Sequence, residues 1–101
     1  MKEYEIYLPT TFNDGTLVPE KEMQHLKDVL TKTFGGYTHM QQRNEGAWSV
    51  GGVTFHDEVS IMRVLDDCSA SFDVHLFKLD LEVRFKQDSI LIVRREVSVV
   101  T

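Results

Sequence analysis

The spacing of apolar residues divides the chain into alternating and helical segments. Apolar and polar residues alternate over residues 4–8, which predicts a strand, and Pro9 ends it because proline lacks the N–H that a sheet ladder needs. Residues 19–34 carry apolar side chains every three or four positions, with Pro19 at the start and acidic residues in the first turn, which predicts a helix. The apolar stripe of this helix consists of Met23, Leu26, Val29, Leu30 and Phe34.

Two glycine pairs mark the middle of the chain. Gly35-Gly36 is typical of a helix C-cap, so Tyr37 begins a strand, which becomes polar on both faces over residues 41–44 as an edge strand does. Gly51-Gly52 indicates a turn into the next strand, over residues 53–65. Apolar residues occupy both faces of that strand, which is typical of a central strand or of a sheet covered on both sides.

Residues 72–86 fit two patterns. Apolar residues alternate with charged ones through the second half, which favours a strand. The segment also has opposite charges four residues apart and two helical apolar stripes, which favours a helix. One stripe consists of Phe72, Leu76, Leu79 and Val83, and the other of Val74, Phe77, Leu81 and Phe85. We predict a helix capped by Ser69 or Ser71, with one stripe facing the sheet. The alternative is a hairpin that pairs residues 77–85 with 90–99.

A last strand is predicted over residues 90–100. The resulting order predicts one α+β domain over residues 1–101, a ferredoxin-like βαββαβ sandwich: a four-stranded antiparallel sheet with two helices on one face. The chain also resembles a group of small uncharacterised ferredoxin-like proteins in the runs YEIYLPTTFNDG, FGGYT, GAW, DEVSIMRV and FKQDSILIV. This resemblance implies a helix before Phe85 and implies no activity. The pair Ala47-Trp48 departs from the group's pattern, in which Gln-Trp is commoner.

Composition restricts the classes of partner. The chain has 101 residues and a formal net charge of −5, which argues against binding to nucleic acid or to an anionic membrane. An RNA-recognition domain would need aromatic residues on the third strand, where Ile61, Met62 and Val64 stand instead. No apolar run approaches the roughly 20 residues of a membrane span. The single cysteine, Cys68, and a charged N-terminus without a signal-peptide pattern lead us to expect a cytoplasmic protein.

Candidate chemistry is sparse. The histidines lack the spacing of a metal-binding pair, and no phosphate-binding glycine loop is present, so we expect no metal and no cofactor. The candidate ligand-binding residues gather around the central hairpin of the predicted fold: Tyr7, Trp48, Glu58 and Arg63. The aromatic residues would wall a pocket, Glu58 or a histidine would act as a base, and Arg63 would hold an anionic oxygen.

Two functions remain open. The first is a small homo-oligomer, most simply a dimer, with a binding or regulatory role. It rests on surplus apolar surface: the second stripe of the late helix, and Tyr7 with Ile90 and Ile92 on the other face of the sheet. The second is a cofactor-independent enzyme of the dimeric α+β barrel kind, acting on a small apolar or anionic substrate, which is an argument from fold alone.

Overall fold

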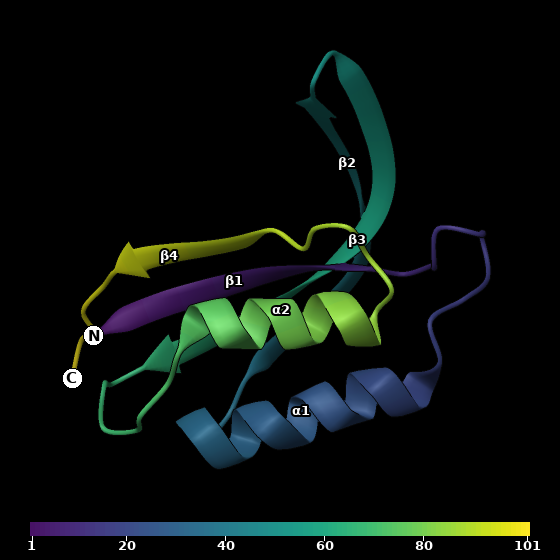
Figure 1. Cartoon of the computed structure of the whole chain (residues 1–101). Coiled ribbons are helices and arrows are strands. Elements are labelled where there is room, and N and C mark those ends of the chain that lie inside the picture. Colours follow the sequence, from purple (N-terminus) through teal and green to yellow (C-terminus); the bar gives the residue numbers. More distant parts are fainter.

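A computed structural model describes the backbone of residues 1–101 and all side chains except those of Arg43, Trp48, Val50 and residues 53–57. The chain forms an α+β domain in which both helices lie on the same side of the sheet (Figure 1). The antiparallel strand order β2-β3-β1-β4 fits the predicted ferredoxin-like fold. The elements are β1 (Lys2–Pro9), α1 (Glu20–Phe34), β2 (Thr38–Val50), β3 (Val53–Asp66), α2 (Val74–Arg84) and β4 (Ile92–Glu96).

The second strand departs from the prediction of four uninterrupted strands. The pairing of β2 with β3 shifts register between Met40 and Asn44, which is a bulge in the ladder. If β2 is divided at this bulge, the sheet has five strands rather than the predicted four; if β2 is followed through the bulge, the order contains four. Because β3 pairs with β1 only from Val59 onward, the earlier part of the hairpin continues as a two-stranded arm. This arm rises on the side of the sheet away from the helices and closes at Gly51-Gly52 (Figure 1).

The core lies between the helices and one face of the sheet. Alternation in β1 buries Tyr4, Ile6 and Leu8 on the covered face, as the sequence pattern predicts. Leu26 and Leu30, the two buried residues of α1, pack against this face, so the prediction of the first helix and its apolar stripe is confirmed. The complete buried cluster is Tyr4, Ile6, Leu8, Leu26, Leu30, Met62, Val64, Leu81, Phe85 and Ile90.

Helix α2 resolves the ambiguous segment. Residues 74–84 are helical, so the predicted helix is confirmed and the hairpin alternative is wrong. Its cap is Asp73 instead of the predicted serines: the Asp73 carboxylate accepts the backbone N–H groups of His75 at 3.0 Å and Leu76 at 3.2 Å. Ser69 is unable to cap this helix, because it lies in the preceding turn and donates its hydroxyl to Asp67 at 2.6 Å.

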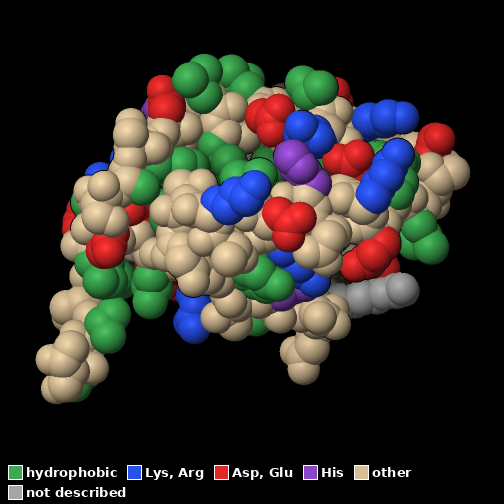
Figure 2. Space-filling view, turned by 90° about the horizontal axis from the view of Figure 1, so that it is seen from below, with side chains coloured by type: hydrophobic (Ala, Val, Ile, Leu, Met, Phe, Trp, Pro, Cys, Tyr) green, Lys and Arg blue, Asp and Glu red, His purple; other side chains and the backbone are tan. Residues whose placement is uncertain are grey.

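The two apolar stripes of α2 differ in burial. The stripe that includes Leu81 and Phe85 packs into the core, and Phe72 joins the partly buried residues around it. The other stripe is left in solvent, as predicted, and apolar side chains are visible among charged ones on the helical side of the molecule (Figure 2). Its exposed members are Leu76, Leu79 and Val83.

Strand β4 is shorter than the predicted span of 90–100. Its only neighbour is β1, and the ladder between them runs out where Lys2 pairs with Glu96. One further hydrogen bond, from the Val97 N–H to the Met1 carbonyl at 3.0 Å, follows it. The pairing with β1 ends there, and the last residues of the chain form no strand in spite of their alternating pattern.

The glycine at the end of α1 is predicted to be essential to the helix terminus. Gly35 has φ of 84° and donates its N–H to the Thr31 carbonyl at 2.9 Å. A side chain there forces strained backbone, so Gly35→Ala should lower the free energy of unfolding by about 1 kcal/mol in chemical denaturation. Gly36→Ala is the matched control, because Gly36 lacks positive φ and has open space around it. We expect a change within about 0.5 kcal/mol for this control; equal losses for both variants would contradict the assignment.

Candidate functional site

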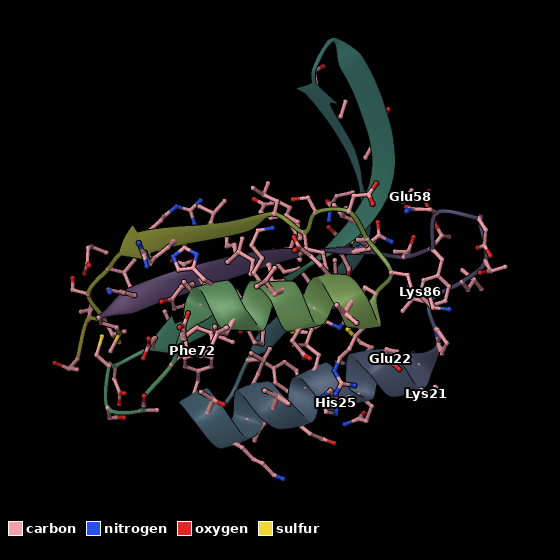
Figure 3. All side chains as sticks on the ribbon, in the orientation of Figure 1. Lys21, Glu22, His25, Glu58, Phe72 and Lys86 are labelled. Carbon is pink, nitrogen blue, oxygen red and sulfur yellow. The ribbon has the colours of Figure 1, made fainter. Side chains whose placement is uncertain are left out.

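Three of the four residues predicted to form a site have side chains that the structure describes, and these three lie at different places on the sheet. Tyr7 and Arg63 both lie on the open face of the sheet, meaning the face without helices, but in different rows of the ladder. Glu58 stands at the base of the arm, before the part of β3 that pairs with β1 (Figure 3). The side chain of Trp48 lies outside the described part of the chain. That these four residues bind a ligand therefore stays a prediction, and the three that are described line no common hollow.

The open face carries an apolar row that crosses the sheet. The row runs from β2 through β3 and β1 to the residue before β4, and its members are Met40, Ile61, Tyr7 and Leu91. The prediction that Ile90 and Ile92 share this face is wrong, since Ile90 is 1% exposed in the core and Leu91 is 58% exposed. The alternation of residue types did not show which of Ile90 and Leu91 faces the core, because both are apolar.

An ion cluster borders the apolar row. Arg95 contacts the carboxylates of Glu3, at 3.7 Å, and of Glu5, and the Tyr7 hydroxyl donates to Glu5 at 3.3 Å. Arg63 lies beside Glu5 on the neighbouring strand, and no ion pair joins it to any side chain that the structure describes. With two acids and two arginines, this border has no net formal charge, whereas the chain as a whole carries −5.

The most chemically varied surface is a hollow of about 250 Å³ between α1 and the strands β2 and β3, which we call the His39 hollow. The residues that line it come from α1, from β2 and β3, from the end of β1 and from the loop between β1 and α1. They are Pro9, Thr10, Val18, Glu20, Met23, Lys27, His39, Gln41 and Ser60. Because β2 is an edge strand, nothing beyond it in the sheet closes this side, and the hollow stays open to solvent.

A histidine–serine pair forms the floor of the His39 hollow. His39 Nε2 lies 3.2 Å from Ser60 Oγ, and Ser60 is only 6% exposed. Either partner can donate this hydrogen bond, depending on the tautomer of the ring. The other ring nitrogen, Nδ1, is buried and has no partner among the described atoms. An unpartnered buried polar group costs about 1–3 kcal/mol, so its retention calls for an explanation, and function is one of the recognised ones.

Opposite charges flank this pair. Burial lowers the pKa of His39 below its ordinary value of 6.5, and nearby Lys27 lowers this pKa further while Glu20 raises it. The imidazole is therefore neutral at pH 7, which is the form that accepts a proton from a hydroxyl group or from a bound molecule. The Lys27 ammonium lies 5.9 Å from the centre of the Tyr37 ring, close enough for a cation–π contact.

Two other depressions have simpler chemistry. A hollow of about 240 Å³ at the end of α1 contains Arg63 as its only charged residue among those described. A smaller gap of about 30 Å³ separates the two helices, where Glu22 and His25 lie on the side of α1 that faces α2 (Figure 3). Arg84 forms an ion pair with Glu22 of α1 at 3.7 Å, across the gap, and another with Asp80 of its own helix at 3.1 Å. Its role here is structural.

The unusual environment of His39 should be visible in the pH dependence of stability. Because its folded pKa is lower than its unfolded pKa near 6.5, the unfolded chain binds more protons just below that pH. The histidine's contribution is therefore complete above pH 6.5 and is lost as the pH falls through the folded pKa. We expect the free energy of unfolding, measured with urea between pH 7 and pH 5, to fall less steeply in His39→Gln than in the wild type.

His75→Gln is the control for this measurement, because His75 is an exposed residue of α2 outside the hollow. This variant should keep the wild-type slope. The acids with lowered pKa, Asp14, Asp67 and Glu82, contribute equally to the wild type and to both variants, so their effect cancels in the comparison. Parallel curves for the wild type and His39→Gln would contradict the assignment.

Comparisons with known proteins add a fold relationship. No protein-family model and no curated protein matches this sequence. A solved structure described as a phage SAM lyase in complex with S-methyl-5'-thioadenosine is similar to this chain, with a TM-score of 0.66. The sequence identity is 13%, and the match covers 94% of this chain and 80% of that chain. At this identity the similarity shows the fold alone.

No helix among the described residues is long and apolar enough to cross a membrane.

Proposed function

We propose that this domain binds a small polar molecule in the His39 hollow and that it does so as a homodimer. The observation that carries the proposal is the His39–Ser60 pair, a part-buried hydrogen-bonding unit that lines an open hollow of about 250 Å³. Binding sites for small molecules combine apolar walls with a few placed polar groups, and here Met23 and Val18 supply apolar surface beside the pair. The exposed free thiol of Cys68 supports a reducing, cytoplasmic compartment.

A cofactor-independent enzyme is the second candidate. It is favoured by one specific observation, namely the contact of the His39 imidazole with the Ser60 hydroxyl at 3.2 Å, together with the burial that lowers the pKa of His39. His39 would act as general base, either on Ser60 or on a proton of the substrate. Lys27 would hold an anionic oxygen, the role that the sequence suggested for Arg63. The phage SAM lyase supports an enzymatic use of this fold by analogy only.

Ligand binding is predicted to depend on the histidine–serine pair. A thermal-shift screen of small polar metabolites should include S-methyl-5'-thioadenosine, the molecule bound in the similar structure. A ligand present at 100 times its Kd stabilises the folded state by about 2.7 kcal/mol, which raises Tm measurably. We expect His39→Ala and Ser60→Ala to weaken binding at least tenfold in calorimetry, and His75→Ala to leave it unchanged. Binding that is indifferent to both His39 and Ser60 would refute the proposal. Product formation from a bound ligand would favour the enzyme.

The open face of the sheet is the surface we propose for the second copy. This face spans eight paired residues of β1 and of β3, five of β4 and three of β2 before the bulge. At about 4.8 Å between strands and about 3.3 Å per residue it covers roughly 400 Å² in plan, about half of the roughly 800 Å² per partner of a standard interface before the relief of the side chains is added. The exposed stripe of α2 has only three side chains and is smaller. The neutral border of the open face lets two chains of net charge −5 meet there without repulsion.

A two-fold axis parallel to the strands, between β3 and β1, makes the open face self-complementary. Such an axis places Ile61 of one copy opposite Tyr7 of the other, because these residues pair across the two strands within each copy. The same operation places Arg63 opposite Glu5. The arm rises beside this face and would border the second copy (Figure 1).

Charge introduced into the apolar row should separate the dimer. We expect the wild type to show twice the 11.7 kDa mass of one chain in light scattering at micromolar concentration. Leu91→Asp should give the mass of one chain while retaining the wild-type circular dichroism, because Leu91 is 58% exposed and outside the core. Leu79→Asp is the matched control on α2, where the side chain is 60% exposed, and it should stay dimeric. A monomeric or trimeric wild type, or dissociation by Leu79→Asp alone, would exclude this interface.

A further inference from the structure

The two charged residues that line the His39 hollow from α1 have opposite signs and are not joined to each other. Glu20 and Lys27 both contribute to the wall of the hollow. No ion pair links either of them to any side chain that the structure describes. Glu22, on the same helix, does have a partner: it is paired with Arg84 at 3.7 Å.

Helix geometry sets the separation of these two charges. Glu20 and Lys27 are seven residues apart, which is close to two turns, so they project from nearly the same side of α1 about 10 Å apart along its axis. His39 lies within the electrostatic range of both, because Lys27 lowers its pKa and Glu20 raises it. The hollow therefore presents a negative group at one end, a positive group at the other, and neutral hydrogen-bonding groups on its floor.

We infer that the ligand of the His39 hollow is a dipolar molecule, with a cationic group held by Glu20 and an anionic group held by Lys27. This inference rests on the proposed ligand-binding function. The hollow of about 250 Å³ is open to solvent, so the separation of the two charges, rather than the volume, sets the length of the ligand, and this length suits a linear molecule of about eight to ten non-hydrogen atoms. The flexible Lys27 side chain shortens the span of about 10 Å between the charges to one that such a molecule covers.

A chain-length series of ω-amino acids tests this inference directly. The probes are 3-aminopropanoate, 4-aminobutanoate, 6-aminohexanoate and 8-aminooctanoate, with hexanoate and hexylammonium as singly charged controls. We expect calorimetry at low salt to show an affinity maximum near 6-aminohexanoate. This probe should bind at least tenfold more tightly than either control, because only it satisfies both charges. An affinity that is equal for the doubly and singly charged probes would overturn the inference.

Charge-removing variants assign each end of the ligand. Lys27→Met should weaken 6-aminohexanoate at least tenfold and leave hexylammonium unchanged, and Glu20→Gln should do so while leaving hexanoate unchanged. Lys32→Met, in the last turn of α1 and outside the hollow, should leave all the affinities unchanged. Because Glu20 also stands in the first turn, where the helix dipole favours an acid, the stability of Glu20→Gln is measured separately by thermal denaturation.

The outcomes separate this inference from the proposed function. If a ligand from the broader screen needs His39 and Ser60 but is indifferent to Lys27→Met and Glu20→Gln, the dipolar ligand is wrong and the binding site stands. If no ligand, dipolar or otherwise, depends on His39, both proposals fail. Retention of full 6-aminohexanoate affinity in both charge variants would likewise place its binding elsewhere on the protein.

Discussion

Removal of one face of the sheet from water is the constraint on which the rest of this structure depends. Tyr4, Ile6 and Leu8 occupy that face from β1, and α1 and α2 cover it. Each fully buried large apolar side chain contributes about 1.5–3 kcal/mol, so the register of these strands is strongly fixed. Once this register is fixed, the same alternation determines that Tyr7 points away from the helices and that Ser60 points toward them.

The placement of Ser60 explains why a polar site forms at the margin of the core. Ser60 shares the covered face of β3 with Met62 and Val64, so its hydroxyl is withdrawn from water. A buried hydroxyl needs a partner, and His39 on the adjacent edge strand supplies it. The edge position of β2 then leaves the pair beside an open hollow instead of sealing it inside the core.

Most of the fold was predictable from the sequence because it follows from local patterns. The 3.6-residue stripe of α1, the glycine turn at Gly51-Gly52 and the alternation in β1 are signals of this kind. The end of β4 was not predictable, because it depends on the register of β4 with β1. The bulge after Met40 has no clear sequence signal either, because neither Gln nor Arg is characteristic of one.

The candidate site was harder to predict than the fold, since it depends on pairing between strands. We selected Tyr7 and Arg63 by residue type. Both alternate with buried residues of their strands, so they lie on the open face and away from the hollow beside α1. A signal for the His39 hollow was present: Ser60 lies in phase with two buried apolar residues, so it required a polar partner from a neighbouring element. Which histidine supplies that partner depends on the register of β2 with β3, and the sequence does not specify that register.

Strand β2 links the two proposed surfaces. His39 and Met40 are consecutive residues, so they point to opposite faces of the sheet: His39 into the hollow and Met40 into the apolar row of the open face. Before the bulge, β2 is paired with β3 over only three residues, Thr38 to Met40. A second copy packed on Met40 would therefore restrain the short segment that positions His39, and separation of the copies would release it. In the proposed dimer, the oligomeric state and the geometry of the His39–Ser60 pair would be coupled through this one short strand segment.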